Sequence, residues 1–203
     1  DTPLRPLPEH SYYARSKRES EDLVFEAQRA GQLWATAVRP SVVYGTFDRQ
    51  FVPRLARVIR RGFAPVIAGG HNTLSVVHAA NVADGLVRAA GTDAANGKAY
   101  NLANDHDVTV REFFERAAEG LEQRLRIVSV PMIVARAAFA VIKSVAPLFV
   151  GNRFKAMTAS SLDFLARDNP FSSELARREL GWDPPVRPET EIPEAFRLWS
   201  AHH

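Results

Sequence analysis

The sequence predicts an α/β fold with a largely parallel sheet. Segments with the helical spacing of apolar residues alternate along the chain with short runs rich in β-branched residues, which is the order expected of βαβ units. The clearest of these runs, residues 34–43, is mostly apolar, as is typical of a parallel strand buried on both faces. Thr109 is followed three residues later by Glu112, the capping-box pattern that opens a helix.

The first quarter of the chain predicts a loop, a helix, a strand and a second helix. Three prolines within the first ten residues argue against regular structure there. A helical pattern then runs from Tyr12 to about Gly31, where a glycine can end the helix. We expect 34–43 to form one continuous strand that Tyr44 and Gly45 end, and a helix to follow over about 51–61.

The alternation continues to the end of the chain. The expected elements are a strand over 74–78, a helix over 81–90 with Asn81 as N-cap, a strand over 98–103, a helix from Thr109, a strand over 126–130, a helix over 131–150, a helix from Ser172 or Ser173 to Leu180, and a helix over 191–199. Gly181 ends the penultimate helix, and Trp182 with the two prolines that follow indicates a surface loop.

Composition excludes several classes of function. The chain has 203 residues, a net charge of +3 and no cysteine, so disulfides, thiolate catalysis and cysteine-based zinc sites are ruled out. The arginines are spread along the chain without a basic stripe, and we therefore expect no nucleic-acid partner. No group of His, Asp and Glu has metal-ligand spacing, so no metal is predicted. No charged segment followed by an apolar one opens the sequence, which favours a cytoplasmic location.

Tyr13 and Lys17 are candidates for acid/base chemistry. Four residues apart on a helix, their side chains share one face. A phenol is a poor acid or base near neutral pH, but a lysine ammonium close to it favours the phenolate form. The alternative is an exposed helix on which Lys17 pairs with Glu21, one turn further on.

Four motifs follow one another along the chain. They are Tyr13-x-x-Ser16-Lys17-x-x-x-Glu21, Val38-Arg39-Pro40-Ser41-Val42-Val43-Tyr44-Gly45, Val77-His78-Ala79-Ala80-Asn81-Val82-Ala83-Asp84 and Gly97-Lys98-Ala99-Tyr100-Asn101-Leu102. With this order of motifs, the sequence resembles the extended short-chain dehydrogenase/reductase family, the NAD-dependent epimerase/dehydratase group, over essentially its whole length. The resemblance implies the C-terminal part of a Rossmann-type parallel sheet and a smaller α/β substrate-binding domain.

The resemblance also implies a reaction and a cofactor. Tyr13 would be the general acid/base, and Lys17 would hydrogen-bond the nicotinamide ribose and favour the tyrosinate. Pro40, Ser41, Val42 and Val43 would form the nicotinamide-side wall of the cofactor site. The reaction would be hydride transfer to or from NAD or NADP at a secondary alcohol or ketone. A homodimer through the helix of Tyr13 would be usual for the family.

The sequence departs from the family pattern in two places. It has no Gly-x-x-Gly-x-x-Gly turn for the pyrophosphate and no Ser or Thr on a strand before the Tyr13 helix. We therefore expect the chain to be the C-terminal portion of a longer enzyme, inactive alone. Residues 1–50 would complete the Rossmann domain and 51–203 would be a mixed substrate-binding region, with about 74–104 returning to the sheet. The residues that would distinguish NAD from NADP are not in the sequence.

Other motifs resemble the 3β-hydroxysteroid and sterol-4-carboxylate dehydrogenase branch. They are Tyr44-Gly45 with Asp48, Phe51-Val52-Pro53, Asp168-Asn169-Pro170-Phe171-Ser172 and Glu179-Leu180-Gly181-Trp182. Leu74 stands where nucleotide-sugar enzymes of the family carry a phosphate-binding Arg. Tyr44, Leu74 and His78 are thus candidates for contact with an apolar, sterol-like substrate, although His78 is more readily a structural hydrogen-bonding residue. A nucleotide-sugar epimerase or dehydratase and a non-catalytic dinucleotide-binding relative are the alternatives.

The apolar run 131–150 has three interpretations. Arg136, Lys143 and Pro147 interrupt it, so it falls short of the roughly 20 apolar residues of a membrane span. It can be a buried or lid helix, a wall for an apolar substrate, or a contact with a membrane surface. The last would make the protein a peripheral membrane protein.

Overall fold

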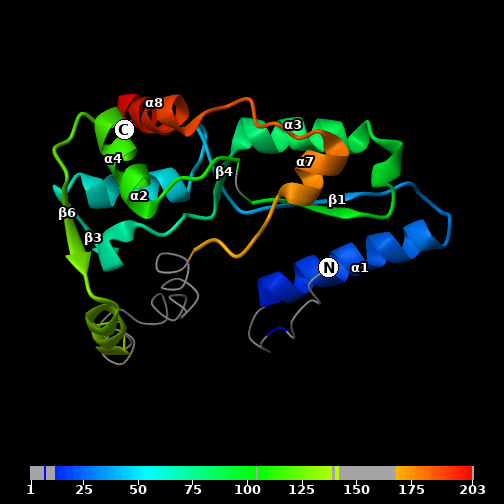
Figure 1. The fold of residues 1–203 in the computed structure, drawn as a ribbon, viewed down its shortest axis with the longest axis horizontal. Coiled ribbons are helices and arrows are strands. Elements are labelled where there is room, and N and C mark those ends of the chain that lie inside the picture. Colours follow the sequence, from blue (N-terminus) through cyan, green and yellow to red (C-terminus); the bar gives the residue numbers. More distant parts are fainter. Residues whose placement is uncertain (1–6, 8–11, 104, 139, 142–167, 203) are drawn as a thin grey trace.

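The computed structural model describes residues 7, 12–103, 105–138, 140, 141 and 168–202 (Figure 1). In chain order the helices are α1 (Tyr12–Arg29), α2 (Phe51–Ile59), α3 (Ala79–Ala90), α4 (Val110–Gly120), α7 (Glu174–Leu180) and α8 (Pro188–Ala201). The strands are β1 (Ala37–Pro40), β2 (Val42–Tyr44), β3 (Phe63–Ile67), β4 (Val76–His78), β5 (Ala99–Leu102) and β6 (Arg126–Val130). Two 3₁₀ turns span Ala68–Gly70 and Asp93–Ala95, and residues 132–138, 140 and 141 are also helical.

The described strands form three parallel pairs. β1 pairs with β5, β2 with β4, and β3 with β6. In these registers Arg39 lies opposite Asn101, and Tyr44 opposite His78. Because each pair is parallel and most of the strands are separated by helices, the prediction of an α/β fold with parallel strands is confirmed. The division of the chain near residue 50 stays a prediction.

The predicted continuous strand over 34–43 is wrong in one respect. The structure divides it at Ser41, where the chain changes partners. The backbone N–H of Ser41 donates to the carbonyl of Leu102 at 3.2 Å, and the next N–H, of Val42, donates to the carbonyl of Ser75 at 3.4 Å. The N–H groups of Ala37 and Ser41 donate to β5, to the carbonyls of Lys98 and Leu102, so the missing N–H of Pro40 lies on the opposite side of the strand, where it leaves no donor for a neighbour.

β3 is an element that the sequence did not indicate. Its middle residue is Pro65, which removes one backbone donor and is a signal against a strand. The strand nevertheless pairs with β6 along its full length, from Phe63 to Ile67. Hydrogen-bonded pairing with β6 therefore outweighs the local preference of Pro65 against a strand.

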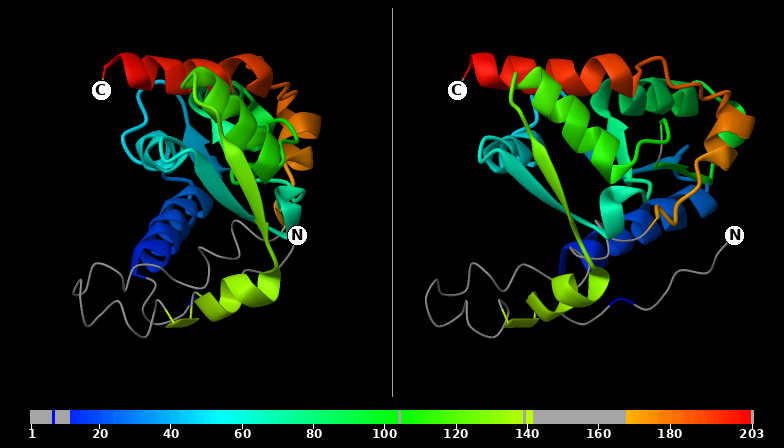
Figure 2. Two further views of the ribbon diagram at one scale, coloured as in Figure 1. Left: turned by 90° about the vertical axis from the view of Figure 1, so that its left-hand side faces the viewer. Right: turned by 60° about the vertical axis from the view of Figure 1, so that its left-hand side comes forward.

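Two clusters of buried residues hold the fold together. The first lies between α2, α4, α8 and β3 and has at its centre the edge-to-face ring pairs of Phe113 with Tyr44 and with Phe196. Figure 2 shows α4 and α8 side by side over this cluster. The second packs β5 against α7 and includes Trp182, whose side chain is 1% exposed. The prediction that Trp182 belongs to a surface loop is therefore wrong.

The helix ends confirm some predictions and correct others. Thr109 and Glu112 form both hydrogen bonds of the predicted capping box. Gly181 ends α7 in the left-handed region with φ of 61°, as predicted. The N-cap of α3 is His78, not Asn81, because the His78 Nδ1 accepts from the Ala80 N–H at 3.3 Å. α8 begins three residues before the predicted start, with Pro188 in its first turn.

Candidate active site

Tyr13 and Lys17 lie on α1 as the helical spacing predicts. Both side chains are exposed, Tyr13 by 77%, and the Lys17 Nζ lies 5.9 Å from the centre of the Tyr13 ring. The phenol and the ammonium are thus neighbours at the surface, within reach of a bound molecule. No residue of α1 is buried.

Glu21 has a different partner from the one that the surface-pair alternative requires. Its carboxylate accepts two hydrogen bonds from Arg39 of β1, one of them from Nε to Oε2 at 2.9 Å. This hydrogen-bonded pair raises the pKa of the Arg39 guanidinium. Among the described residues Lys17 forms no ion pair. The alternative, a surface pair of Lys17 with Glu21, is therefore not what the structure contains.

The Glu21–Arg39 pair determines how far along the axis of β1 each turn of α1 lies. The two elements run in opposite directions, so the first turn of the helix points toward the carboxyl end of the strand (Figure 1). Tyr13 precedes Glu21 by eight residues, or about 12 Å of helix. Along a strand the same distance is about three to four residues. We therefore expect Tyr13 to lie level with Val42 and Val43.

Residues 40–43 provide a mixed surface at this level. Pro40 and Val43 are exposed, while Ser41 and Val42 are half-buried. The Ser41 hydroxyl donates to the carbonyl of Ala103 at 2.8 Å, so this side chain holds the sheet. An apolar ring can pack on Pro40 and Val43, and Lys17 can donate to a ribose hydroxyl. The residues present thus fit the nicotinamide end of a dinucleotide, while the sequence offers no Gly-x-x-Gly-x-x-Gly turn for its phosphates.

The three residues expected at the substrate lie in the interior. Leu74 and Tyr44 belong to the first core cluster and are 3% and 2% exposed. Burial raises the pKa of the Tyr44 hydroxyl. The ring of His78 is 5.2 Å from that of Tyr44, edge to face. The structure thus brings Tyr44 and His78 together, but it exposes neither of them, nor Leu74, to a ligand on the described surface.

His78 has one ring nitrogen without a hydrogen bond. Its Nδ1 caps α3, as described above, which agrees with a structural role. Its Nε2 is buried, has no hydrogen-bond partner among the described residues and lies 3.8 Å from Oε2 of Glu191 on α8. Burial lowers the pKa of His78, and the nearby carboxylates of Glu191 and Asp105 oppose this effect.

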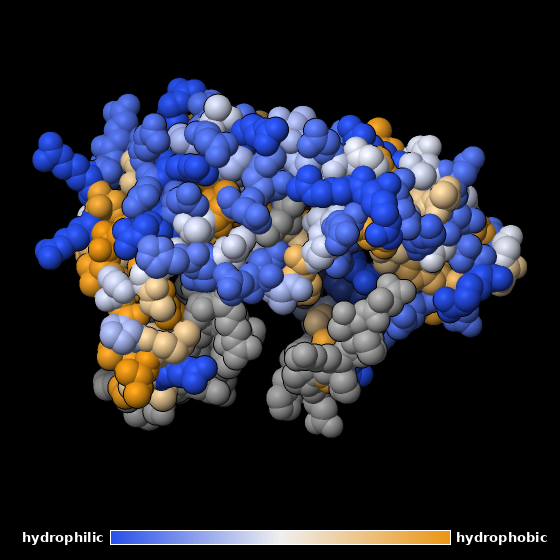
Figure 3. Space-filling model, viewed as in Figure 1, coloured by the Kyte–Doolittle hydropathy of each residue, from blue (hydrophilic) through white to orange (hydrophobic). Residues whose placement is uncertain are grey.

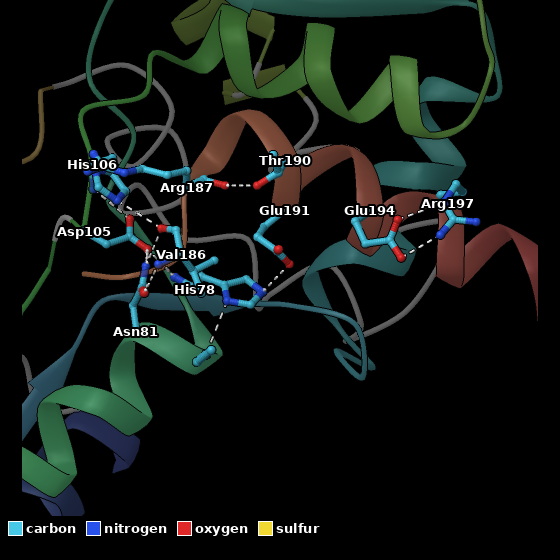
Figure 4. A network of polar contacts seen from close by, with 11 residues as sticks. His78, Asn81, Asp105, His106, Val186, Arg187, Thr190, Glu191, Glu194 and Arg197 are labelled. Atoms are coloured by element: carbon cyan, nitrogen blue, oxygen red, sulfur yellow. Dashed lines mark hydrogen bonds and ion pairs between the residues drawn. The ribbon is translucent and has the colours of Figure 1, made fainter.

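A buried carboxylate that the sequence did not single out joins this region to the rest of the fold (Figure 4). Asp105, 2% exposed, accepts from the His78 N–H and the Asn81 Nδ2, both at 2.7 Å, and from the His106 N–H at 2.9 Å. Asn81 also bonds both backbone groups of Val186, just before α8. Asp105 and Asn81 are 24 residues apart, and no local pattern indicates their contact.

A polar cavity of about 530 Å³ lies beside this network. It is lined by residues 105–107, 171–174 and Arg177. The Arg177 guanidinium donates to the carbonyl of Asp105 at 2.7 Å and lies over the ring of Trp182. Across the described residues no group of three or more His, Asp or Glu side chains is arranged to hold a metal ion.

Comparison with known proteins decides the family. The family model of the 3-beta hydroxysteroid dehydrogenase/isomerase family matches residues 1–133, about two thirds of the chain. The chain belongs to this family. The matched part contains Tyr13, Lys17, the 40–43 segment and His78. The predicted membership of the extended short-chain dehydrogenase/reductase family, and of its 3β-hydroxysteroid branch, is thus confirmed.

Several curated proteins are similar to this member of the 3-beta hydroxysteroid dehydrogenase/isomerase family. A 4-hydroxy-2-methyl-3-oxo-4-farnesyl-3,4-dihydroquinoline-1-oxide ketoreductase from Stigmatella aurantiaca is 29% identical over 87% of the chain and 53% of the relative. A 3beta-hydroxysteroid-dehydrogenase/decarboxylase isoform 2 from Arabidopsis thaliana is 28% identical over 89% and 34%. A 2-alkyl-3-oxoalkanoate reductase from Stenotrophomonas maltophilia is 29% identical over 86% and 54%. The chain spans about half the length of the first of these relatives, and less of the plant protein.

Solved structures support the fold. A structure of RMD from Pseudomonas aeruginosa, complexed with NADPH, superposes with a TM-score of 0.66 at 17% identity, over 98% of this chain and 59% of the other. A dTDP-glucose 4,6-dehydratase from Bacillus anthracis, in complex with NAD, gives 0.63 at 16% identity, over 99% and 55%. Within the described residues, every helix is too short or too polar to span a bilayer.

Proposed function

We propose that the protein is an NAD(P)-dependent oxidoreductase that acts on a secondary alcohol or ketone. The observation that carries the proposal is the exposed Tyr13 phenol with the Lys17 ammonium 5.9 Å from its ring centre, on a helix fixed alongside β1. Family membership and relatives named as a dehydrogenase and as reductases support it.

The chain's own residues would position the reactants and move a proton. The Tyr13 hydroxyl donates a proton to the substrate oxygen in reduction and accepts it in oxidation. Lys17 would hydrogen-bond the ribose of a bound nicotinamide cofactor, and its charge favours the tyrosinate form of Tyr13. Pro40 and Val43 would give the nicotinamide ring an apolar surface, and Ser41 holds this segment next to β5 through its hydrogen bond to Ala103. The nicotinamide cofactor, when bound, supplies or accepts the hydride.

The test compares two neighbouring tyrosines in the full-length protein. Tyr13→Phe should lower kcat by about 10²- to 10⁴-fold, the usual contribution of a positioned acid/base. Tyr12→Phe is the matched control, because Tyr12 is equally exposed at 76% and occupies the same turn of α1. Lys17→Ala should lower kcat and weaken binding of NADH and NADPH. Unchanged turnover in both Tyr13→Phe and Lys17→Ala would refute the assignment.

We propose that the substrate is apolar. Suitable probes, chosen from the relatives, are a 3β-hydroxysteroid with NAD⁺ or NADP⁺ and a 2-alkyl-3-oxoalkanoate with NADH or NADPH. The names of two relatives, a 3beta-hydroxysteroid-dehydrogenase/decarboxylase and a 2-alkyl-3-oxoalkanoate reductase, support an apolar substrate over a nucleotide sugar. Turnover of a dTDP-sugar in place of both apolar probes would favour the epimerase/dehydratase alternative. Dinucleotide binding without turnover of any probe would favour the non-catalytic one.

We also propose that the protein contacts a membrane surface through the region that begins at β6. Val128, Ile133, Val134 and Val141 are 41–78% exposed, and Figure 3 shows a hydrophobic area where β6 and the helical residues 132–138, 140 and 141 lie. From Gln123 to Leu162 the sequence contains no Asp or Glu. It contains Arg124, Arg126, Arg136, Lys143, Arg153 and Lys155. An apolar and purely basic region suits a bilayer with anionic lipids.

Vesicle co-sedimentation tests this contact. The protein should bind vesicles that contain phosphatidylserine more strongly than vesicles of phosphatidylcholine, and Ile133→Ser should reduce the binding. Val87→Ser on α3 is the control, since Val87 is 74% exposed and lies outside this region. Equal binding by wild type and Ile133→Ser would contradict the proposal.

A homodimer through α1 is the proposed assembly. The helix has no buried residue, and Leu23 is 66% exposed. Leu23→Glu should therefore convert a dimer to a monomer in size-exclusion chromatography with light scattering. A mass that does not change in this variant would exclude α1 from the interface.

A further inference from the structure

Lys17 lies between two possible partners on α1. Tyr13 is four residues before it and Glu21 four residues after it, so both are within reach of one flexible lysine side chain. An ammonium that turns toward Glu21 is less available to a phenolate at Tyr13 or to a ribose. The availability of the Glu21 carboxylate therefore matters to the proposed acid/base.

The structure shows where that carboxylate is held. Arg39 donates to both of its oxygens, from Nε and from a terminal nitrogen. The pair is partly shielded, with side chains 40% exposed for Arg39 and 23% for Glu21. A bidentate guanidinium–carboxylate pair of this kind is stronger and more directional than a lysine–carboxylate contact on a helix surface. Lys17 correspondingly makes no ion pair among the described residues, and its Nζ is near the Tyr13 ring.

We propose that Arg39 is a positioning residue: by binding Glu21 it keeps this carboxylate away from Lys17, and so leaves the Lys17 ammonium to act on Tyr13 and the cofactor ribose. The inference rests on the proposed function of Tyr13. It gives the Arg of the Arg-Pro motif a role that depends on charge, in addition to the attachment of α1 to β1.

The other charged groups near this face do not replace Arg39. Arg15 and Glu19 pair with each other at 3.8 Å, so they largely neutralise one another. Asp22 lies close enough to Arg39 to raise the pKa of its guanidinium, after the larger effects of Glu21. Arg18, three residues before Glu21, is a further cation on α1, but Arg39 donates hydrogen bonds to both oxygens of the Glu21 carboxylate.

Three variants of the full-length protein separate this electrostatic role from simple attachment of α1. Arg39→Met frees the Glu21 carboxylate, Glu21→Gln removes its charge, and the double variant does both. All three lose the bidentate pair, so a purely structural role predicts the same change in each. Arg39→Lys, which keeps the positive charge, is the conservative control. The measurement is the pH dependence of kcat/KM for a 3β-hydroxysteroid with NAD⁺, with urea unfolding to establish that each variant is folded.

The proposal predicts a shift in only one of the three variants. In Arg39→Met the rise of kcat/KM with pH should move up by about half a pH unit, the effect of offsetting one unit charge at about 6 Å in a nearly aqueous medium. In the double variant and in Arg39→Lys the midpoint should return to that of the wild type, and in Glu21→Gln it should not rise. Equal midpoints in Arg39→Met and wild type, or the same shift in all three pair-breaking variants, would overturn the proposal.

This outcome can be distinguished from failure of the proposed function. If Tyr13→Phe retains full activity, Tyr13 is not the acid/base and the role of Arg39 falls with it. If Tyr13→Phe is inactive while the Arg39→Met profile is unshifted, only the positioning role is refuted. Fluorescence titration with NADH gives a second readout, since Arg39→Met should weaken binding more than the double variant does.

Discussion

A methyl group at Gly120 would test how closely α4 and α8 approach each other. Gly120 is the last residue of α4, and a Cβ there would lie 2.1 Å from the carbonyl oxygen of Pro193 and 2.7 Å from its Cα. Real Cβ contacts essentially never fall below 3.0 Å, so the two helices would have to separate by about 0.9 Å. The obstacle is backbone on α8, which cannot rotate aside as a side chain can.

The expected cost follows from two opposing effects. Forced separation in a packed core costs typically about 1–3 kcal/mol, and the upper end applies here because Phe113 and Phe196 meet across the same interface. Alanine is favoured over glycine in a helix by about 1 kcal/mol, which offsets part of this cost. Gly120→Ala should therefore lower the free energy of unfolding by about 2 kcal/mol.

Urea denaturation followed by circular dichroism measures the change. The control is Gly91→Ala at the end of α3, where φ is −90° and the nearest atom to an added Cβ, the Val87 oxygen, is 3.4 Å away. This variant should be as stable as the wild type or slightly more so. A Gly120→Ala protein that is as stable as Gly91→Ala would refute the packing geometry of α4 and α8.

Three further predictions concern the polar groups of the core. Burial lowers the pKa of His78 below its ordinary value of about 6.5, so protonation favours the unfolded chain. The free energy of unfolding should therefore fall as the pH drops through about 6.5. The variant His78→Asn keeps an acceptor for the α3 cap and should reduce this pH dependence, as measured by urea titrations at several pH values. Asp105→Asn should lower the free energy of unfolding by about 3 kcal/mol, since an amide cannot accept hydrogen bonds from all three donors. The control Asp183→Asn, at the surface, should leave the free energy of unfolding almost unchanged. Thermal unfolding of the two variants measures the difference. Thr109→Ala should cost about 1 kcal/mol through loss of the α4 cap, and a change below 0.3 kcal/mol in the same assay would contradict the importance of the capping box.

The elements that sequence alone could predict are those with local signals. α1 has a helical spacing of apolar residues with Gly31 after its end, and α4 has its capping box, so both were expected close to their observed positions. The order of four motifs was enough to indicate the family, because each motif has a fixed place in the chain. These features depend on residues within a few positions of one another.

The features that escaped prediction depend on residues far apart in the chain. β3 forms because β6, some 60 residues later, pairs with it in spite of Pro65. Trp182 is buried in the second core cluster, and its Nε1 donates to the carbonyl of Asn81 at 3.0 Å, a contact across 101 residues. Likewise, Glu21 could be placed on the face of Lys17 from helical spacing, but its partner on β1 could not. Long-range pairs of this kind leave no periodic pattern in a sequence.

The change of partner at Ser41 has a mechanical consequence. Within two consecutive residues the chain is hydrogen-bonded to β5 through Ser41 and to the β4 side through Val42. A hinge needs a residue whose backbone torsions can rotate without breaking such hydrogen bonds, and neither Ser41 nor Val42 is such a residue. This junction therefore opposes relative motion of β4 and β5. The amides of Ser41 and Val42 should accordingly exchange with deuterium at the same slow rate, as parts of one rigid unit.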